Sequence, residues 1–216
     1  HGILELSNNC RCSCAYCGIR SERRTLPRYR LTVEEAVEAA GEAIGRYGFK
    51  ALVLQSGERA YEMEELTEMI RIIRRRWPCL LIASFGEVDE KGLERLFEAG
   101  VRGLLLRFET SNPDLYGRYR FGSSLERRLA LLRQAAEMGY LVMTGGLIGL
   151  PGQTPRDLAQ AIVLARDLHP EMYSFGPFLP SPDTPLADVH APALDEVLKV
   201  LAVLRLCNGG SGNLLV

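Results

Sequence analysis

Four of the six cysteines in this 216-residue chain lie within eight residues, directly after a predicted strand at 3–7. Cys10, Cys14 and Cys17 have the spacing C-x3-C-x2-C, and an aromatic residue, Tyr16, stands just before the last of them. Three close thiolates without an evident fourth partner fit an iron–sulfur cluster that keeps one iron open, because saturated ferredoxin and zinc sites normally have four nearby ligands. A zinc knuckle that uses Cys12 as its fourth ligand is the alternative, although we interpret Cys12 as incidental.

Polar residues also follow other predicted strands. The segment 55–58 (Gln-Ser-Gly-Glu) comes directly after a continuous apolar strand at 51–54, and its glycine would let the backbone come close to a ligand. Glu87 and Glu109 follow the strands at 80–84 and 103–107. Taken alone, the segment 55–58 would more often be an ordinary strand-to-helix turn.

The elements that must position these residues alternate along the chain. Short apolar runs bounded by turn residues predict strands, and apolar residues at helical spacing predict a helix after each strand. The strands are expected at 3–7, 51–54, 80–84, 103–107, 141–143 and 172–178. The helices are expected at 33–44, 63–73, 89–99, 125–136, 155–165 and 194–204, and residues 213–216 could begin a seventh strand.

Six alternating strands and helices indicate one parallel sheet wound with a single hand. We therefore predict an α/β fold, a partial TIM-type (β/α)6 barrel formed as a single domain over residues 1–216. Chemistry in such barrels lies at the carboxyl ends of the strands, where the polar residues above fall. Residues 208–216 are either a linker or the start of the seventh strand, and 209–212 (Gly-Gly-Ser-Gly) resembles an engineered linker.

Composition excludes several classes of protein. The 26 basic and 27 acidic residues give a net charge of -1, so no global field attracts nucleic acid or an anionic membrane. No apolar run approaches the ~20 residues of a membrane span, and no signal-peptide pattern is present, so we expect a soluble protein. Crowded cysteines make a poor disulfide framework, which favours a reducing, cytoplasmic location.

The cysteine loop resembles the signature of radical S-adenosylmethionine (SAM) enzymes. Further motifs stand in the order and approximate spacing of the HydE family of FeFe-hydrogenase maturases, which is related to biotin synthase and methylornithine synthase. These motifs are 55–58, 107–110 (Arg-Phe-Glu-Thr), 149–154 (Gly-Leu-Pro-Gly-Gln-Thr) and 176–186 (Gly-Pro-Phe-Leu-Pro-Ser-Pro-Asp-Thr-Pro-Leu). The resemblance covers nearly the whole chain and weakens after about residue 206.

The resemblance implies two cofactors and a reaction. A 4Fe-4S cluster held by Cys10, Cys14 and Cys17 would bind SAM at its open iron and cleave it reductively to a 5′-deoxyadenosyl radical. The implied SAM contacts are Tyr16 at the adenine, Gln55, Ser56, Gly57 and Glu58 at the methionine ammonium, Glu109 at the ribose and Arg128 at the methionine carboxylate. A salt bridge from Glu109 to Arg107 or Arg128 is the structural alternative. Candidates to contact substrate are Ser84, Glu87, Arg107, Thr144 and Tyr173.

The resemblance also suggests a substrate and partners. A HydE-like enzyme would act on a small organometallic iron complex, take electrons from a ferredoxin or flavodoxin type of donor, and work with other hydrogenase maturases. Two features depart from that pattern: Ser181 stands where a histidine is common, and the sequence that would close the barrel is absent. The alternatives are a methylornithine- or biotin-synthase-like enzyme on an organic substrate, or an inactive iron–sulfur-binding core. For biotin synthase, Cys79 and Cys207 make an unconvincing second cluster site.

Overall fold

The computed structural model describes residues 1–207 and 213–215. Contacts along the chain divide it into two compact units. The first unit comprises His1–Arg11, Arg24–Leu105 and Gln134–Leu141; the second comprises Cys12–Arg23, Leu106–Arg133 and Val142–Val216. The prediction of one domain over 1–216 stays a prediction, and each unit is described here by itself.

The first unit contains a parallel sheet in the order β1 (Gly2–Ser7), β2 (Ala51–Ser56), β3 (Leu80–Ser84) and β4 (Gly103–Leu105). Leu54 of β2 pairs with Leu4 on one side and with Ala83 on the other. Leu52, Val53 and Leu54 are all buried. A continuous apolar run of this kind is expected for a parallel strand that is covered on both faces.

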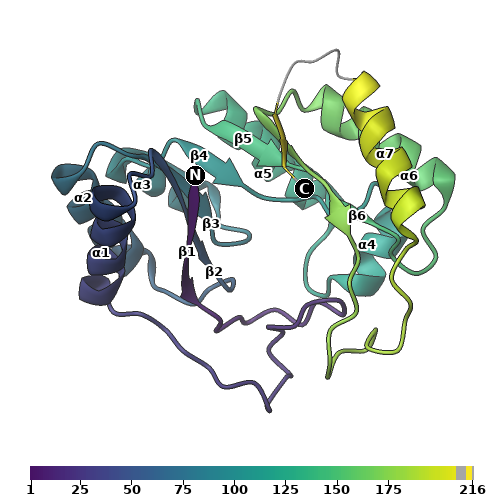
Figure 1. The fold of residues 1–216 in the computed structure, drawn as a ribbon, viewed down its shortest axis with the longest axis horizontal. Coiled ribbons are helices and arrows are strands. Elements are labelled where there is room, and N and C mark those ends of the chain that lie inside the picture. The colour runs from purple at the N-terminus through teal and green to yellow at the C-terminus, as the bar shows by residue number, and fades with distance from the viewer. Residues whose placement is uncertain (208–212, 216) are drawn as a thin grey trace. The chain divides into compact units, whose positions relative to one another are not determined.

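Helices α1 (Val33–Gly41), α2 (Met63–Arg76) and α3 (Glu90–Ala99) pack beside these strands, and a short π-helix (Glu42–Arg46) extends α1 (Figure 1). Thr32 caps α1: its side chain accepts a hydrogen bond from the Glu35 backbone, and the Glu35 carboxylate accepts one from the Thr32 backbone. This capping box satisfies two backbone donors that the helix leaves open. Met69, Ile70 and Ile73 of α2 are fully buried in the core.

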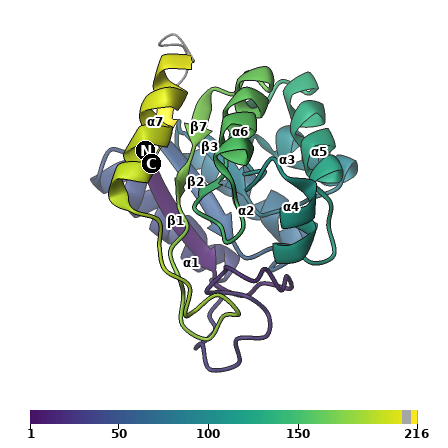
Figure 2. The same ribbon diagram turned by 90° about the vertical axis from the view of Figure 1, so that its right-hand side faces the viewer.

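The second unit contains two sets of parallel strands. β5 (Leu141–Thr144), β7 (Met172–Ser174) and β9 (Asn213–Leu215) form one set in that order, and β6 (Leu147–Ile148) pairs with β8 (Gly176–Pro177). Its helices are α4 (Pro113–Tyr119), α5 (Leu125–Glu137), α6 (Pro155–Asp167) and α7 (Leu194–Cys207), with α6 and α7 side by side (Figure 2). The first residue of β5 and the last turn of α5 belong to the first unit.

The structure confirms the predicted alternation and corrects its details. The strand expected at 172–178 is two short strands interrupted at Phe175, and the strand expected at 103–107 ends at Leu105. Helix α4 was not predicted. Residues 213–215 do form the additional strand, whereas 208–212 lie outside the described residues. None of the helices in the described part of the chain has the length and apolar character needed to span a bilayer.

Candidate active site

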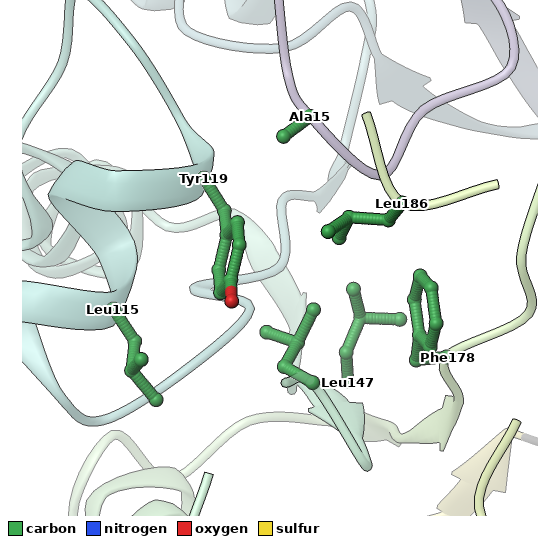
Figure 3. Packing of buried hydrophobic residues seen from close by; sticks show 7 residues of the cluster. Ala15, Leu115, Tyr119, Leu147, Phe178 and Leu186 are labelled. Atoms are coloured by element: carbon green, nitrogen blue, oxygen red, sulfur yellow. The ribbon is translucent and has the colours of Figure 1, made fainter. Parts of the chain in front are cut away.

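The later part of the cysteine loop is built into the second unit. Cys14 is buried, and Nη1 of Arg120 lies 3.1 Å from its Sγ. The next residue, Ala15, donates its backbone N–H to the carbonyl of Tyr119 at 2.8 Å. Ala15 also packs with Tyr119, Leu147, Phe178 and Leu186, whose side chains point toward one another (Figure 3). The loop is therefore held at Cys14 by a charged side chain and at Ala15 by the backbone and the core.

Backbone hydrogen bonds fold the segment from Cys12 to Ser21 into tight turns. The N–H of Cys17 donates to the carbonyl of Cys14 at 3.2 Å, and the N–H of Arg20 donates to the carbonyl of Cys17 at 3.2 Å. The carbonyl of Cys12 accepts a bond from the Ser21 N–H at 2.9 Å. Cys12 and Cys17 are half-buried. The predicted ligands Cys14 and Cys17 are thus held within one short turn.

In the first unit, Gly57 supports the start of the cysteine loop. Its N–H donates to the carbonyl of Ser7 at 3.1 Å. A Cβ at this position would lie 2.0 Å from the carbonyl oxygen of Asn9 and 2.7 Å from Cβ of Cys10. The sequence suggested that this glycine lets the backbone approach a ligand; the structure gives it a second reason, which is the close approach of the Asn9–Cys10 backbone.

Glu58, next to this glycine, is a buried carboxylate. One of its oxygens, Oε2, accepts the backbone N–H of Glu87 at 2.9 Å, and its carbonyl accepts the N–H of Arg11 at 3.1 Å. Gly86, which has φ +74°, lies so close that a Cβ there would be 2.2 Å from the same carboxylate oxygen. Glu58 therefore joins the cysteine loop to the segment after β3, and brings the predicted residues Glu58 and Glu87 together.

The other polar side chains of the first unit make local contacts. Nε2 of Gln55 donates to the Glu5 carboxylate at 2.7 Å, and the hydroxyl of Ser56 donates to the carbonyl of Gly57 at 3.0 Å. Partial burial raises the pKa of Glu5, and the hydrogen bond from Gln55 lowers it. Ser84, the last residue of β3, is half-buried and pairs with Gln55 across the sheet. Gln55 and Ser84 thus lie side by side near the carboxyl ends of neighbouring strands.

Glu109 has an unusual backbone conformation. Its φ is +67°, in the left-handed region that a non-glycine residue rarely adopts. The segment is held by backbone bonds from the Glu109 N–H to the carbonyl of Gly145 (3.1 Å) and from the Leu147 N–H to the carbonyl of Glu109 (2.8 Å). Arg107 lies 3.2 Å from the Glu109 carboxylate, so one of the salt bridges considered from the sequence is present. Strain of this kind costs about 1–3 kcal/mol and clusters at functional sites.

Arg128 is buried, whereas its neighbour Arg127 is exposed. Nε of Arg128 donates to the hydroxyl of Tyr116 at 3.1 Å, and Nη1 donates to the carbonyl of Arg107 at 3.1 Å. Tyr116 lies on α4, the helix that the sequence did not predict. The buried guanidinium thus joins α4 and α5 to the segment that carries Arg107.

Tyr16 shares its surroundings with several of these charged groups. Burial raises the pKa of Tyr16 well above its ordinary value. The negative charges of Glu109 and Cys14 raise this pKa further, while Arg120 and Arg128 lower it. The second unit therefore brings together Tyr16, Cys14, Glu109 and Arg128, which were predicted as site residues.

The remaining candidates of the second unit are more deeply buried. The hydroxyl of Thr144 is directed to the backbone, because it donates to the carbonyl of Leu106 at 2.7 Å. Tyr173 is buried, and this burial raises the pKa of its hydroxyl. Thr144 and Tyr173 are partners across β5 and β7. They lie on adjacent strands, as their positions in the sequence predict.

Arg120 is a site residue that sequence reasoning missed. It lies 106 residues from Cys14 in the chain, and no motif links the two. The signal that could have located its neighbourhood is Asn112-Pro113, an N-cap residue followed by proline at the first helical position. These two residues predict the start of α4, which ends at Tyr119, one residue before Arg120.

Within residues 1–207 and 213–215, no three His, Cys, Asp or Glu side chains form a group that could hold one metal ion. In a 4Fe-4S cluster each thiolate binds a different iron, so the ligands of a cluster need not converge on one point as those of a zinc ion do. The assignment of Cys10, Cys14 and Cys17 as cluster ligands stays a prediction.

Solved structures contain the same fold. An X-ray structure of the FeFe-hydrogenase maturase HydG from Carboxydothermus hydrogenoformans matches with a TM-score of 0.85 and 26% identity, over 99% of this chain and 52% of that one. This similarity confirms the predicted α/β class with parallel strands, which a partial TIM-type barrel fits.

Sequence comparisons agree with the structural one. The chain is 40% identical over 205 residues to the FeFe-hydrogenase maturase subunit HydE of Thermotoga maritima, covering 94% of this chain and 58% of that protein. It is 31% identical over 210 residues to the 3-methylornithine synthase of Methanosarcina barkeri, again covering 94% and 58%. The chain thus spans less than two thirds of the length of these relatives.

The match extends to a family model. The model of the radical SAM superfamily covers residues 4–165, a range that includes the cysteine loop and the segments around Gly57, Glu109 and Arg128. That range is well over half of the chain, and the resemblance drawn from the motifs is confirmed. The chain belongs to the radical SAM superfamily.

Proposed function

We propose that this chain is the catalytic core of a radical SAM enzyme in which Cys10, Cys14 and Cys17 hold a 4Fe-4S cluster. Radical SAM enzymes use such a cluster together with SAM, and membership of the superfamily makes these the expected cofactors. The observation that carries the proposal is the C-x3-C-x2-C loop directly after β1. When bound, the cluster supplies one electron that cleaves SAM to methionine and a 5′-deoxyadenosyl radical.

The donor set fits this group. Thiolates are the usual ligands of iron–sulfur clusters. Arg120 places a permanent positive charge beside the sulfur of Cys14, where it can interact with the negative charge of a bound cluster. The backbone turn from Cys14 to Cys17 keeps both thiols in one loop that is anchored at Ala15. The chain's contribution is to hold these ligands in place.

The resemblance to radical SAM enzymes implies the remaining roles. Gln55 and Ser56 are the last residues of β2, and Gly57 and Glu58 follow it. Backbone carbonyls of this segment would receive the SAM ammonium group. Glu109 would offer a carboxylate that accepts hydrogen bonds from ribose hydroxyls, and Arg107 lies 3.2 Å from that carboxylate. Arg128 would pair with the SAM carboxylate, a task that suits a planar guanidinium. Tyr16 would pack at the adenine.

The test is anaerobic reconstitution of the purified chain, followed by iron analysis and an assay for 5′-deoxyadenosine with SAM and dithionite. The wild-type chain should bind about four irons and form 5′-deoxyadenosine. The Cys14→Ala variant should lose both properties, whereas Cys12→Ala, the control in the same loop, should keep them. Cleavage that survives Cys14→Ala, or is lost equally in Cys12→Ala, would refute the ligand assignment.

For the substrate, we propose a HydE-like role in the maturation of FeFe-hydrogenase. The 40% identity to a HydE subunit supports it. The substrate would be a small organometallic iron complex contacted by Ser84, Glu87, Arg107, Thr144 and Tyr173. A cytoplasmic ferredoxin or flavodoxin would supply the electron, and other hydrogenase maturases, of which HydG is one by its name, would be partners.

An organic substrate is the second candidate, supported by the 31% identity to a 3-methylornithine synthase. The two substrates can be separated with one reconstituted sample. An iron–carbonyl–cyanide complex that raises 5′-deoxyadenosine formation supports the HydE-like role, and hydrogen abstraction from lysine supports the second candidate. A chain that binds its cluster but cleaves no SAM under either condition would be an inactive iron–sulfur-binding core.

A further inference from the structure

We propose that Arg120 is a positioning residue that tunes the iron–sulfur cluster, raising its reduction potential through the sulfur of Cys14. The inference rests on the proposed function, because it takes Cys14 as a cluster ligand. It assigns to Arg120 a role that its position in the sequence does not suggest.

The contact between the two side chains is short and buried. Nη1 of Arg120 lies 3.1 Å from Sγ of Cys14, and both residues are largely hidden from solvent, with 8% and 6% of their surface exposed. A guanidinium keeps its charge at all accessible pH values. A charged hydrogen bond that is removed from water is screened less than one on the surface, so its effect on the sulfur is correspondingly larger.

The protein fixes Arg120 in this position through its backbone. The N–H of Arg120 donates to the carbonyl of Tyr116 at 2.8 Å, in the last turn of α4. The preceding residue, Tyr119, accepts the N–H of Ala15, and its own hydroxyl donates to the carbonyl of Pro151 at 2.8 Å. Cys14 and Ala15 are therefore bound by two consecutive residues, which holds the guanidinium and the thiol in a constant relation.

The consequence for redox chemistry follows from charge. Reduction adds one electron, taken from an external reductant such as dithionite, to a cluster that already carries thiolate charge. A positive charge and an N–H donor at a ligating sulfur stabilise the reduced cluster more than the oxidised one, and hydrogen bonds to sulfur are among the factors that set cluster potentials. The guanidinium keeps its protons, so it transfers none. Arg120 therefore makes the cluster easier to reduce.

The test is a redox titration of the reconstituted chain without SAM, in which the reduced cluster is measured by electron paramagnetic resonance. Arg120→Met removes the positive charge and the N–H donors of the guanidinium but keeps a side chain of similar length. In this variant we expect the ratio of reduced to oxidised cluster at a fixed potential to fall about tenfold, equivalent to ~59 mV for one electron. Arg120→Lys, which keeps a charge, should give an intermediate value. Arg118 is an exposed arginine in α4, the helix that ends just before Arg120, so Arg118→Met is the control and should match the wild type.

Each outcome decides the matter. An unchanged potential in Arg120→Met, with normal iron content, overturns the inference. If that variant cannot hold a cluster, Arg120→Lys and Arg120→Gln replace it: a higher potential with lysine supports the inference, and equal potentials overturn it. A wild-type chain that binds no cluster overturns the proposed function as well, whereas a wild-type cluster whose potential ignores Arg120 overturns this inference alone.

Discussion

A methyl group at Gly57 should disrupt the cysteine loop far more than it destabilises the chain. In Gly57→Ala the new Cβ would lie 2.0 Å from the Asn9 carbonyl oxygen and 2.7 Å from Cβ of Cys10, and real contacts of a Cβ essentially never fall below 3.0 Å. The first of these atoms is in the backbone and the second is attached directly to it, so neither can move aside by a side-chain rotation. The Asn9–Cys10 backbone must therefore shift by about 1 Å.

The size of the effect follows from that shift. Overpacking of a buried position costs about 1–3 kcal/mol, and at this chain length each kcal/mol lowers the Tm by about 2–4 °C. A ligand displaced by ~1 Å can cost a site about a hundredfold in function. We therefore expect Gly57→Ala to fold, with a reduced Tm, but to bind much less iron after reconstitution and to form little 5′-deoxyadenosine.

Differential scanning fluorimetry of the apo chain and iron analysis of the reconstituted chain measure the two effects separately. Gly45→Ala is the matched control, because a Cβ at Gly45 meets nothing within 4 Å. It should leave both the Tm and the iron content close to wild type. Normal iron content in Gly57→Ala would refute the account of Gly57 as support for Cys10, whatever happens to the Tm.

Three further predictions concern buried polar groups. Glu58→Ala removes the acceptor of the Glu87 N–H and should lower the free energy of unfolding by about 1–3 kcal/mol. Glu58→Gln keeps a carbonyl oxygen that can accept this bond, so its loss should be smaller. Equal losses of the two variants in urea unfolding would contradict this prediction. A lysine at position 128 cannot donate to the Tyr116 hydroxyl and the Arg107 carbonyl at once with the geometry of the arginine. SAM binding measured by calorimetry should therefore weaken about tenfold in Arg128→Lys. The same change at the exposed neighbour, Arg127→Lys, should leave SAM binding unchanged. Hydrogen bonds from the hydroxyl and the backbone N–H of Thr154 hold the pKa of Asp157 below its usual value. The ionised Asp157 therefore stabilises the folded chain fully above its unfolded pKa of about 3.9. This stabilisation is lost as the pH falls through the lower pKa of the folded state. The stability gap between wild type and Asp157→Asn should therefore narrow on acidification, and a constant gap from neutral pH to below that range would contradict this.

Much of the fold could be predicted because its signals are local. The capping box at Thr32 and the cap and proline at Thr154-Pro155 mark helix starts in the sequence, and the structure has both. The break at Phe175 and the left-handed conformation of Glu109 could not be predicted, since contacts with distant backbone determine them. Helix α4 could be predicted only in part. Its N-cap can be recognised in the sequence, but the helix is too short to show a clear helical spacing of apolar residues.

The candidate site divides in the same way. Cysteine spacing is a property of the sequence, so the loop was evident at once. The partner of Cys14 was not, because Arg120 is 106 residues away and arrives through a helix that was missed. The contact of the Glu58 side chain was also hidden: its buried carboxylate accepts the backbone N–H of Glu87, and the SAM contact of this segment stays a prediction.

The most direct test of the central claim is the electron paramagnetic resonance spectrum of the reduced, reconstituted chain, recorded with and without SAM. If Cys10, Cys14 and Cys17 hold a cluster with one open iron, a reduced-cluster signal will be present and SAM will change it. A chain that binds about four irons, yet gives the same spectrum with and without SAM, would contradict the claim that this cluster is the site of SAM chemistry.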